Sequence, residues 1–160
     1  MIHILVPAML AAQMSPFVYT NNGGVLTTLH GKCLKASLMG TGAAGSDLTK
    51  GGRPFRCGSA IVTLFPAKDR ILIEFADSQS RAGLVGFAGT LNKAEREVKV
   101  DHLYLNDGQT LQADDGFCII RGDAPKISSI VCEGKISQGS IAFGAMIAFE
   151  TGKTAIKRRR

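Results

Sequence analysis

Short runs of apolar or alternating residues recur through most of this 160-residue chain and constrain its fold more than any other feature. From residue 59 onward they return every eight to fourteen residues, with turn-forming residues between them. Such spacing is typical of antiparallel β-structure. We predict strands at 59–65, 71–76, 83–91, 97–105, 110–113, 117–121, 127–136 and 140–150. About eight short strands predict an all-β single domain, an antiparallel meander that forms a small β-barrel or a β-sandwich.

Alternation along each strand predicts which side chains face the interior. In the segment 97–105, one face carries Val98, Val100, His102 and Tyr104. Both faces of 140–150 are small or apolar, which predicts a central strand that is covered on both sides. Asp107-Gly108 and Asp115-Gly116 are expected in hairpin turns, because Asp and Gly tolerate the backbone that tight turns require.

The four cysteines predict two disulfides that staple this fold. If 117–121 and 127–136 form a hairpin, Cys118 and Cys132 are equidistant from its midpoint and lie opposite each other. By elimination, Cys33 is expected to pair with Cys57. That second bridge would hold down the Gly-rich segment 40–52, which is expected to be a loop.

The region before the meander divides into two parts. Residues 1–12 contain the apolar run 4–12, which has the length of a signal-peptide core, and a first β-strand is the alternative. Residues 13–58 form a Gly-rich N-terminal segment with one or two strands, at 25–29 and 33–39. The meander follows at 59–150 and a basic tail at 151–160.

An export signal together with disulfides predicts a periplasmic or extracellular protein. No segment is long and apolar enough for a transmembrane helix.

The net charge of +6 is unevenly distributed. Residues 30–57 hold five Lys and Arg against one Asp, and the tail holds five more, whereas 58–150 is mildly acidic. Nucleic-acid-binding domains usually spread their cations over a folded face. Nucleic acid is therefore not the expected partner, although weak polyanion binding through 30–57 and the tail is a second alternative.

No convergent catalytic or metal-binding motif is present in the sequence. The pattern Gly40-x-Gly42-x-x-Gly45 lacks the helix that a dinucleotide site needs. His30-x-x-Cys33 has no third orienting group and no closely spaced Cys or His partners, so a disulfide is favoured over a metal or a thiol nucleophile. Asp114 and Asp115 are expected to serve turn structure.

These observations favour an exported, non-enzymatic binding module for a small ligand or a protein partner, with no cofactor and no metal. An inhibitor is one form that such a module could take, and ligand carriers share this general architecture by analogy of fold alone. The candidate binding residues are on the basic loop or in an interior site: Lys50, Arg53, Arg56, His102 and Tyr104. The first alternative is a small hydrolase-like enzyme that uses His102 or His30 with a nearby carboxylate.

Overall fold

The computed structural model describes residues 18–21, 23–79, 83–105, 108–123 and 126–152. This part of the chain contains twelve strands and a short 3-10 helix, η1 (Pro66–Lys68). The strands are β1 (Val18–Asn21), β2 (Gly24–Cys33), β3 (Leu38–Ala43), β4 (Arg53–Pro54), β5 (Cys57–Phe65), β6 (Arg70–Asp77), β7 (Leu84–Asn92), β8 (Glu97–Leu105), β9 (Thr110–Gln112), β10 (Asp115–Arg121), β11 (Ser129–Gln138) and β12 (Ile141–Thr151). The predicted signal segment and the tail from Lys153 lie outside the described residues.

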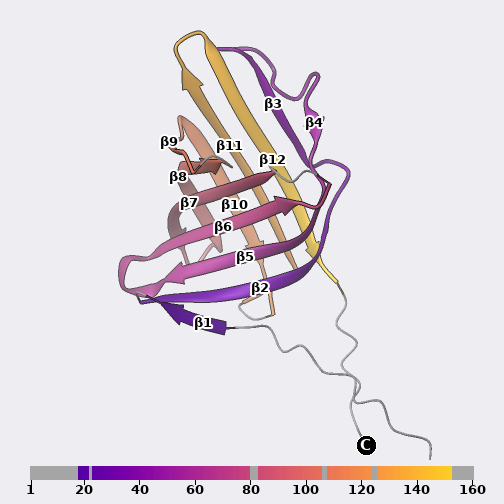
Figure 1. The fold of residues 1–160 in the computed structure, drawn as a ribbon. Helices are drawn as coiled ribbons and strands as arrows, with labels where there is room; N and C mark the ends of the chain where they lie inside the picture. The colour runs from indigo at the N-terminus through magenta and orange to yellow at the C-terminus, as the bar shows by residue number, and fades with distance from the viewer. Residues whose placement is uncertain (1–17, 22, 80–82, 106–107, 124–125, 153–160) are drawn as a thin grey trace, which may run out of the picture.

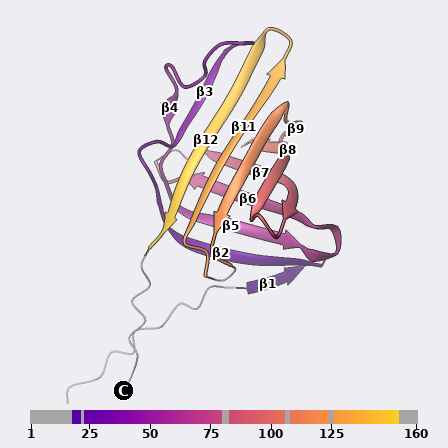
Figure 2. The ribbon, with the colours of Figure 1, turned by 180° about the vertical axis from the view of Figure 1, so that it is seen from behind.

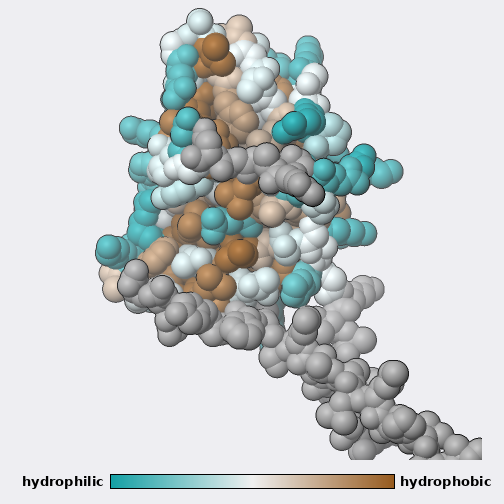
Figure 3. Space-filling model, viewed as in Figure 1, coloured by the Kyte–Doolittle hydropathy of each residue, from teal (hydrophilic) through white to brown (hydrophobic). Residues whose placement is uncertain are grey.

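Eight of these strands form a closed antiparallel barrel, in the order β2, β5, β6, β7, β8, β10, β11 and β12. The barrel closes where β12 returns to β2, through the pairs Phe149–Cys33, Glu150–Lys32 and Thr151–Gly31. Strands β2, β5, β6 and β7 cross one side of the molecule and β10, β11 and β12 the other (Figures 1 and 2). On the surface of the first side, apolar residues lie among polar ones (Figure 3). The all-β prediction is confirmed, and of its two alternatives the barrel is the one observed.

Beyond this short seam β2 and β12 diverge, and each gains another strand along its free edge. Strand β1 pairs with the first half of β2, and β3 pairs with the first half of β12. Residues 40–43, which we expected in a loop, therefore belong to a strand, and the residues between Cys33 and Leu38 form a turn instead of the expected strand. The partner of β3 is about a hundred residues away in sequence, where local patterns carry no information on it.

Strand β12 is covered on both faces, as its composition predicted. Ala145, Ile147 and Phe149 point into the barrel and belong to its core. On the outer face Leu48, from the segment after β3, packs over Gly144, where an added Cβ would lie against the Leu48 side chain. Small residues on the outer face of β12 thus let this segment fold back onto the barrel wall.

Both disulfides form as predicted. Cys118 and Cys132 are paired in register across β10 and β11, and their bridge lies inside the barrel with no exposed surface. Cys33 and Cys57 join the end of β2 to the start of β5. The first bridge ties a hairpin within the core, and the second ties the strand that closes the barrel to its neighbour.

One predicted turn is wrong. Asp115 and Gly116 lie in β10, where they pair with Lys135 and Gly134 of β11. Strands β9 and β10 follow one another along the same edge of β8, interrupted only at residues 113–114, so no chain reversal occurs there. The other predicted hairpin turn, Asp107-Gly108, is only partly described, because residues 106–107 lie outside the described residues. Gly108 has a φ of +76°.

Three phenylalanines pack against one another in the barrel interior. Phe75 packs against Phe87 and Phe149 with ring centroids 6.2 and 5.9 Å apart, and all three side chains are fully buried. Ile71 and Leu91, at the other end of β6 and β7, are each four residues from one of these rings, or about 13 Å along the strand. The two ends of the barrel are therefore filled differently.

Candidate functional site

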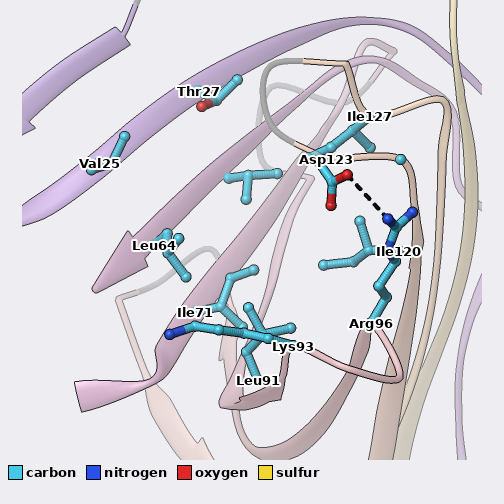
Figure 4. A pocket seen from close by; sticks show the side chains of 12 residues that line it. Val25, Thr27, Leu64, Ile71, Leu91, Lys93, Arg96, Ile120, Asp123 and Ile127 are labelled. Carbon is cyan, nitrogen blue, oxygen red and sulfur yellow. Dashed lines mark hydrogen bonds and ion pairs between the residues drawn. The ribbon is translucent and has the colours of Figure 1, made fainter. Parts of the chain in front are cut away.

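An apolar cavity of about 350 Å³ opens at the end of the barrel opposite the phenylalanines (Figure 4). Its walls come from β2, β5, β6, β7, the loop after β7 and the β10–β11 hairpin. The lining residues are Val25, Thr27, Val62, Leu64, Ile71, Leu91, Lys93, Arg96, Ile120, Gly122, Asp123 and Ile127. Seen as sticks, the aliphatic side chains of opposite walls point toward one another across an open centre.

The cavity follows from the size of the inward-facing residues. Alternate residues of a barrel strand face its interior, and at this end they are Val, Thr, Ile and Leu where the other end has Phe. Val62, Ile71, Ile120 and Ile127 are buried in the wall. Thr27, only 3% exposed, is the polar member of that wall. Short side chains leave the centre of the barrel unfilled at its mouth.

Charged residues form the rim of this cavity. The Lys93 Nζ lies 2.6 Å from the Asp69 Oδ1, and the Arg96 Nη2 donates to the Asp123 Oδ2 at 3.0 Å. Both cations belong to the loop 93–96, whose position is set by main-chain hydrogen bonds. The Ile120 N–H donates to the Arg96 carbonyl at 2.9 Å, and the Leu91 N–H donates to the Asp69 carbonyl at 2.8 Å. Arg96 and Asp69 both have positive φ.

A second charged cluster lies on the outer face of the barrel. Arg70 forms a two-pronged ion pair with Asp101, in which its Nη2 donates to the Oδ1 at 2.8 Å. The Nδ1 of His102 lies 2.7 Å from the same carboxylate oxygen. Hydrogen bonds from Arg70, reinforced by His102, lower the pKa of Asp101 to about 2.

A β-bulge explains why Asp101 and His102 share the outer face. Across β7 and β8, Ala88 pairs with His102 and Gly89 with Val100, so Asp101 is the extra residue. An extra residue reverses the alternation beyond it. Val98, Val100 and Leu103 therefore face the core, and the prediction that His102 and Tyr104 share the face of Val98 and Val100 is wrong. Tyr104 lies outside instead, where its Cβ approaches Gly86 next to Glu74.

The His102 cluster meets one part of the catalytic hypothesis, because an imidazole and a carboxylate lie within hydrogen-bonding distance. Within the described part of the chain, however, no hydrogen bond joins His102 to a hydroxyl or thiol group. Glu74 is on the same face, and burial raises its pKa. His30, the other candidate, is an exposed residue of β2, three positions before the disulfide-bonded Cys33.

The structure brings together two of the three basic-loop candidates. Arg53 and Arg56 line a shallow hollow of about 270 Å³ with Pro54, Asp77 and Gln79, and the Arg56 Nη1 donates to the Gln79 Oε1 at 2.8 Å. Lys50 is exposed in the segment between β3 and β4 and does not line this hollow. None of the five predicted binding residues lines the cavity at the mouth.

The cavity residues could not be picked out from the sequence, because most of them are residue types found on the inner face of any barrel strand. Val, Ile and Leu at alternate positions indicate a strand face, but no local signal separates a filled interior from an open one. Lys93 and Arg96 lie in a polar loop that the sequence marked only as a connection. What brings them beside the β10–β11 hairpin is the pairing of β8 with β10, which places the β7–β8 loop next to Ile120 and Asp123.

Comparison of the chain with protein-family models, curated proteins and solved structures finds no match. Its function is therefore argued from the geometry of the molecule. Among the described residues, no helix has the length and apolar character needed to cross a membrane. In the same residues, no three His, Cys, Asp or Glu side chains come close enough to hold a metal ion.

Proposed function

We propose that this protein is an exported, non-enzymatic binding module that holds a small, largely apolar ligand in the mouth of its barrel. The observation that carries the proposal is the 350 Å³ cavity between β2, β5 and the β10–β11 hairpin. Ligand sites in proteins are commonly apolar hollows of about 300–1,000 Å³ with a few polar groups, and the mouths of β-barrels are a frequent place for them. The volume and the lining both fit that description.

The composition of the wall defines the kind of ligand. A molecule that places about 200 Å² of apolar surface against these aliphatic side chains gains roughly 5 kcal/mol, at ~25 cal/mol per Å². That gain alone corresponds to a dissociation constant of about 0.2 mM before other contacts are added. We therefore expect dissociation constants from the micromolar to the submillimolar range for simple apolar probes.

The two disulfides support the inferred location. Paired cysteines persist in oxidising compartments and are rare in the cytosol. Both disulfides form among the described residues, and in that part of the chain the cysteines do not belong to a cluster that could hold a metal ion. The expected location is therefore the periplasm or the extracellular space, and thiol-alkylating mass spectrometry of protein taken directly from its source tests it. Alkylation of all four cysteines without prior reduction would contradict this location.

Binding at the mouth is tested with N-phenyl-1-naphthylamine, an uncharged probe whose emission rises in apolar surroundings. Leu64→Trp extends a bulky ring from β5 into the cavity, while the matched control Thr63→Trp places the same ring on the opposite face of that strand. We expect Leu64→Trp to weaken probe binding at least about tenfold and Thr63→Trp to leave it nearly unchanged. Folding of both variants is checked by circular dichroism.

Two results would contradict the proposal. Absence of probe binding to the wild-type chain would mean that the cavity does not accept apolar molecules. Equal loss of binding in the two variants would place the probe elsewhere or show a general loss of structure.

A further inference from the structure

The charged residues at the cavity rim are arranged asymmetrically with respect to the cavity. Lys93 and Arg96 both line it, so the aliphatic parts of their side chains form part of the apolar wall while their charged ends reach the rim. Of their two carboxylate partners, Asp69 does not line the cavity, and Asp123 does. In Figure 4 the Lys93 side chain runs alongside Leu91, and Arg96 extends along the wall toward Asp123.

Arg96 and Asp123 also differ in how much of each side chain is exposed to solvent. The Arg96 side chain is 48% exposed, whereas that of Asp123 is 79% exposed. The Asp123 side chain as a whole is therefore the more exposed of the two. A molecule that enters the barrel mouth would meet the cation with part of its hydrogen-bonding capacity still available, because only the Arg96 Nη2 is engaged by Asp123.

Both rim ion pairs are open to exchange. Ion pairs between exposed side chains contribute little to stability because water and salt compete with them. Replacing Asp123 with a ligand carboxylate on Arg96 thus costs little, and a guanidinium can bind a carboxylate through two parallel hydrogen bonds. Lys93 reaches the same opening from the other end of the loop and adds a second positive charge.

We propose that the ligand of this cavity is an amphipathic anion, whose apolar body enters the barrel and whose acidic head group is bound by Lys93 and Arg96. The inference rests on the proposed function of the cavity and adds the charge of the ligand to it. The loop 93–96 acts as the head-group site, because main-chain hydrogen bonds on both of its sides hold it at the mouth. When no ligand is bound, Asp69 forms an ion pair with Lys93, and Asp123 forms one with Arg96.

The test compares three ligands with the same ten-carbon chain: decanoate, 1-decanol and 1-aminodecane. Displacement of N-phenyl-1-naphthylamine from the wild-type protein is measured for each ligand at neutral pH. The two ionic ligands are kept below their critical micelle concentrations, and decanol is kept below its solubility in water. We expect decanoate to bind at least about tenfold more tightly than decanol, because a carboxylate gains charge-assisted hydrogen bonds. The amine is expected to bind most weakly, since it meets two cations. The preference for decanoate should decline as salt is added.

Variants then assign the preference to the rim. Lys93→Gln combined with Arg96→Gln should remove the advantage of decanoate over decanol while decanol still binds. The control is Lys68→Gln, which removes a cation from η1 beside Asp69 without touching the cavity lining. It should leave the preference intact.

The outcomes separate this inference from the proposed function. If the three ligands bind equally, or if the double variant keeps the preference for decanoate, the cavity binds apolar molecules but the head-group site is wrong. If the amine binds most tightly, Asp123 and not the cations selects the ligand, which also overturns the inference. If neither the probe nor any of the three ligands binds, the proposed function itself fails.

Discussion

Cys118 lies directly opposite Cys132 across β10 and β11, and the disulfide that joins them is completely enclosed by the barrel. It therefore acts in two ways. As a cross-link it restricts the unfolded chain, and as a buried pair of sulfur atoms it fills part of the core. The second disulfide, Cys33–Cys57, also cross-links the chain, but it fills less of the core because Cys33 is partly exposed.

The first prediction compares the loss of each bridge. On the chain-entropy argument, loops of these lengths contribute about 3 kcal/mol for Cys118–Cys132 and slightly more for Cys33–Cys57. Replacing Cys118 and Cys132 by Ala also leaves a cavity in the core, which adds about 1–2 kcal/mol to the loss. We expect that double variant to be the less stable of the two, although its loop is shorter. Urea unfolding followed by circular dichroism measures both losses.

The wild-type protein under reducing conditions is the internal control for this comparison. If the Cys33→Ala and Cys57→Ala variant loses more stability than the Cys118→Ala and Cys132→Ala variant, filling of the core by the sulfur atoms is not what distinguishes the bridges. The seam between β2 and β12 would then be the weaker part of the barrel.

The second prediction concerns the ion pair between Arg70 and Asp101. Hydrogen bonds from Arg70 lower the pKa of Asp101 from 3.8 to about 2. The folded state binds the Asp101 proton less tightly than the unfolded state does. The ion pair therefore stabilises the folded protein fully above pH 3.8, and this stabilisation is lost as the pH falls through about 2. The pair is partly exposed, so solvent screening reduces its contribution to roughly 1 kcal/mol. We expect Asp101→Asn to lower the free energy of unfolding by that amount at neutral pH.

Urea unfolding at a series of pH values checks this prediction. The difference between wild type and Asp101→Asn should shrink as the solution is acidified below pH 3.8 and nearly vanish near pH 2. Arg70→Gln is the matched control, because it removes the main cause of the shift from the other side of the pair. A difference that does not change with pH would mean that Asp101 stabilises the bulge through its geometry and not through its charge.

The third prediction concerns the bulge in β8. A Cβ added at Gly89 would overlap the main-chain carbonyl of Lys99 on the neighbouring strand. Neither backbone can yield without disturbing the register at Asp101, so we expect Gly89→Ala to destabilise the barrel by about 3 kcal/mol. Thermal unfolding measures the loss, and the chemical shifts of His102 report whether the bulge survives.

Gly58 is the control for this substitution. It also lies within a strand, but a Cβ there meets no atom within 4 Å. Gly58→Ala should be neutral or slightly stabilising, by about 0.5 kcal/mol, because Ala restricts the unfolded chain more than Gly. Equal effects at the two positions would show that the close approach at Gly89 is relieved by small adjustments, and the account of the bulge would be wrong.

Much of the strand pattern and one disulfide could be predicted from sequence because they depend on near neighbours. Period-two alternation places residues such as Ile71, Ile73 and Phe75 on one face whatever the rest of the chain does. The pairing of Cys118 with Cys132 needed only a symmetric hairpin. The candidate site was not predictable in this way, because Leu64 and Ile120 look the same in sequence whether the interior between them is filled or open.

The short antiparallel strands, and the pairing of the cysteines within and beside them, follow from the order of the residues alone. Local alternation and short connections are sufficient for the strands and for Cys118–Cys132, which involve residues close in the chain, and Cys33–Cys57 then follows by elimination. Three features appear only in the folded molecule: β3 turns back to pair with β12, the bulge at Asp101 moves His102 and Tyr104 to the outer face, and the mouth stays open. Those outcomes depend on where the sheet closes and on which backbones approach closely, as Gly89 and Lys99 do. Such contacts are set by packing between distant segments, which no local pattern records.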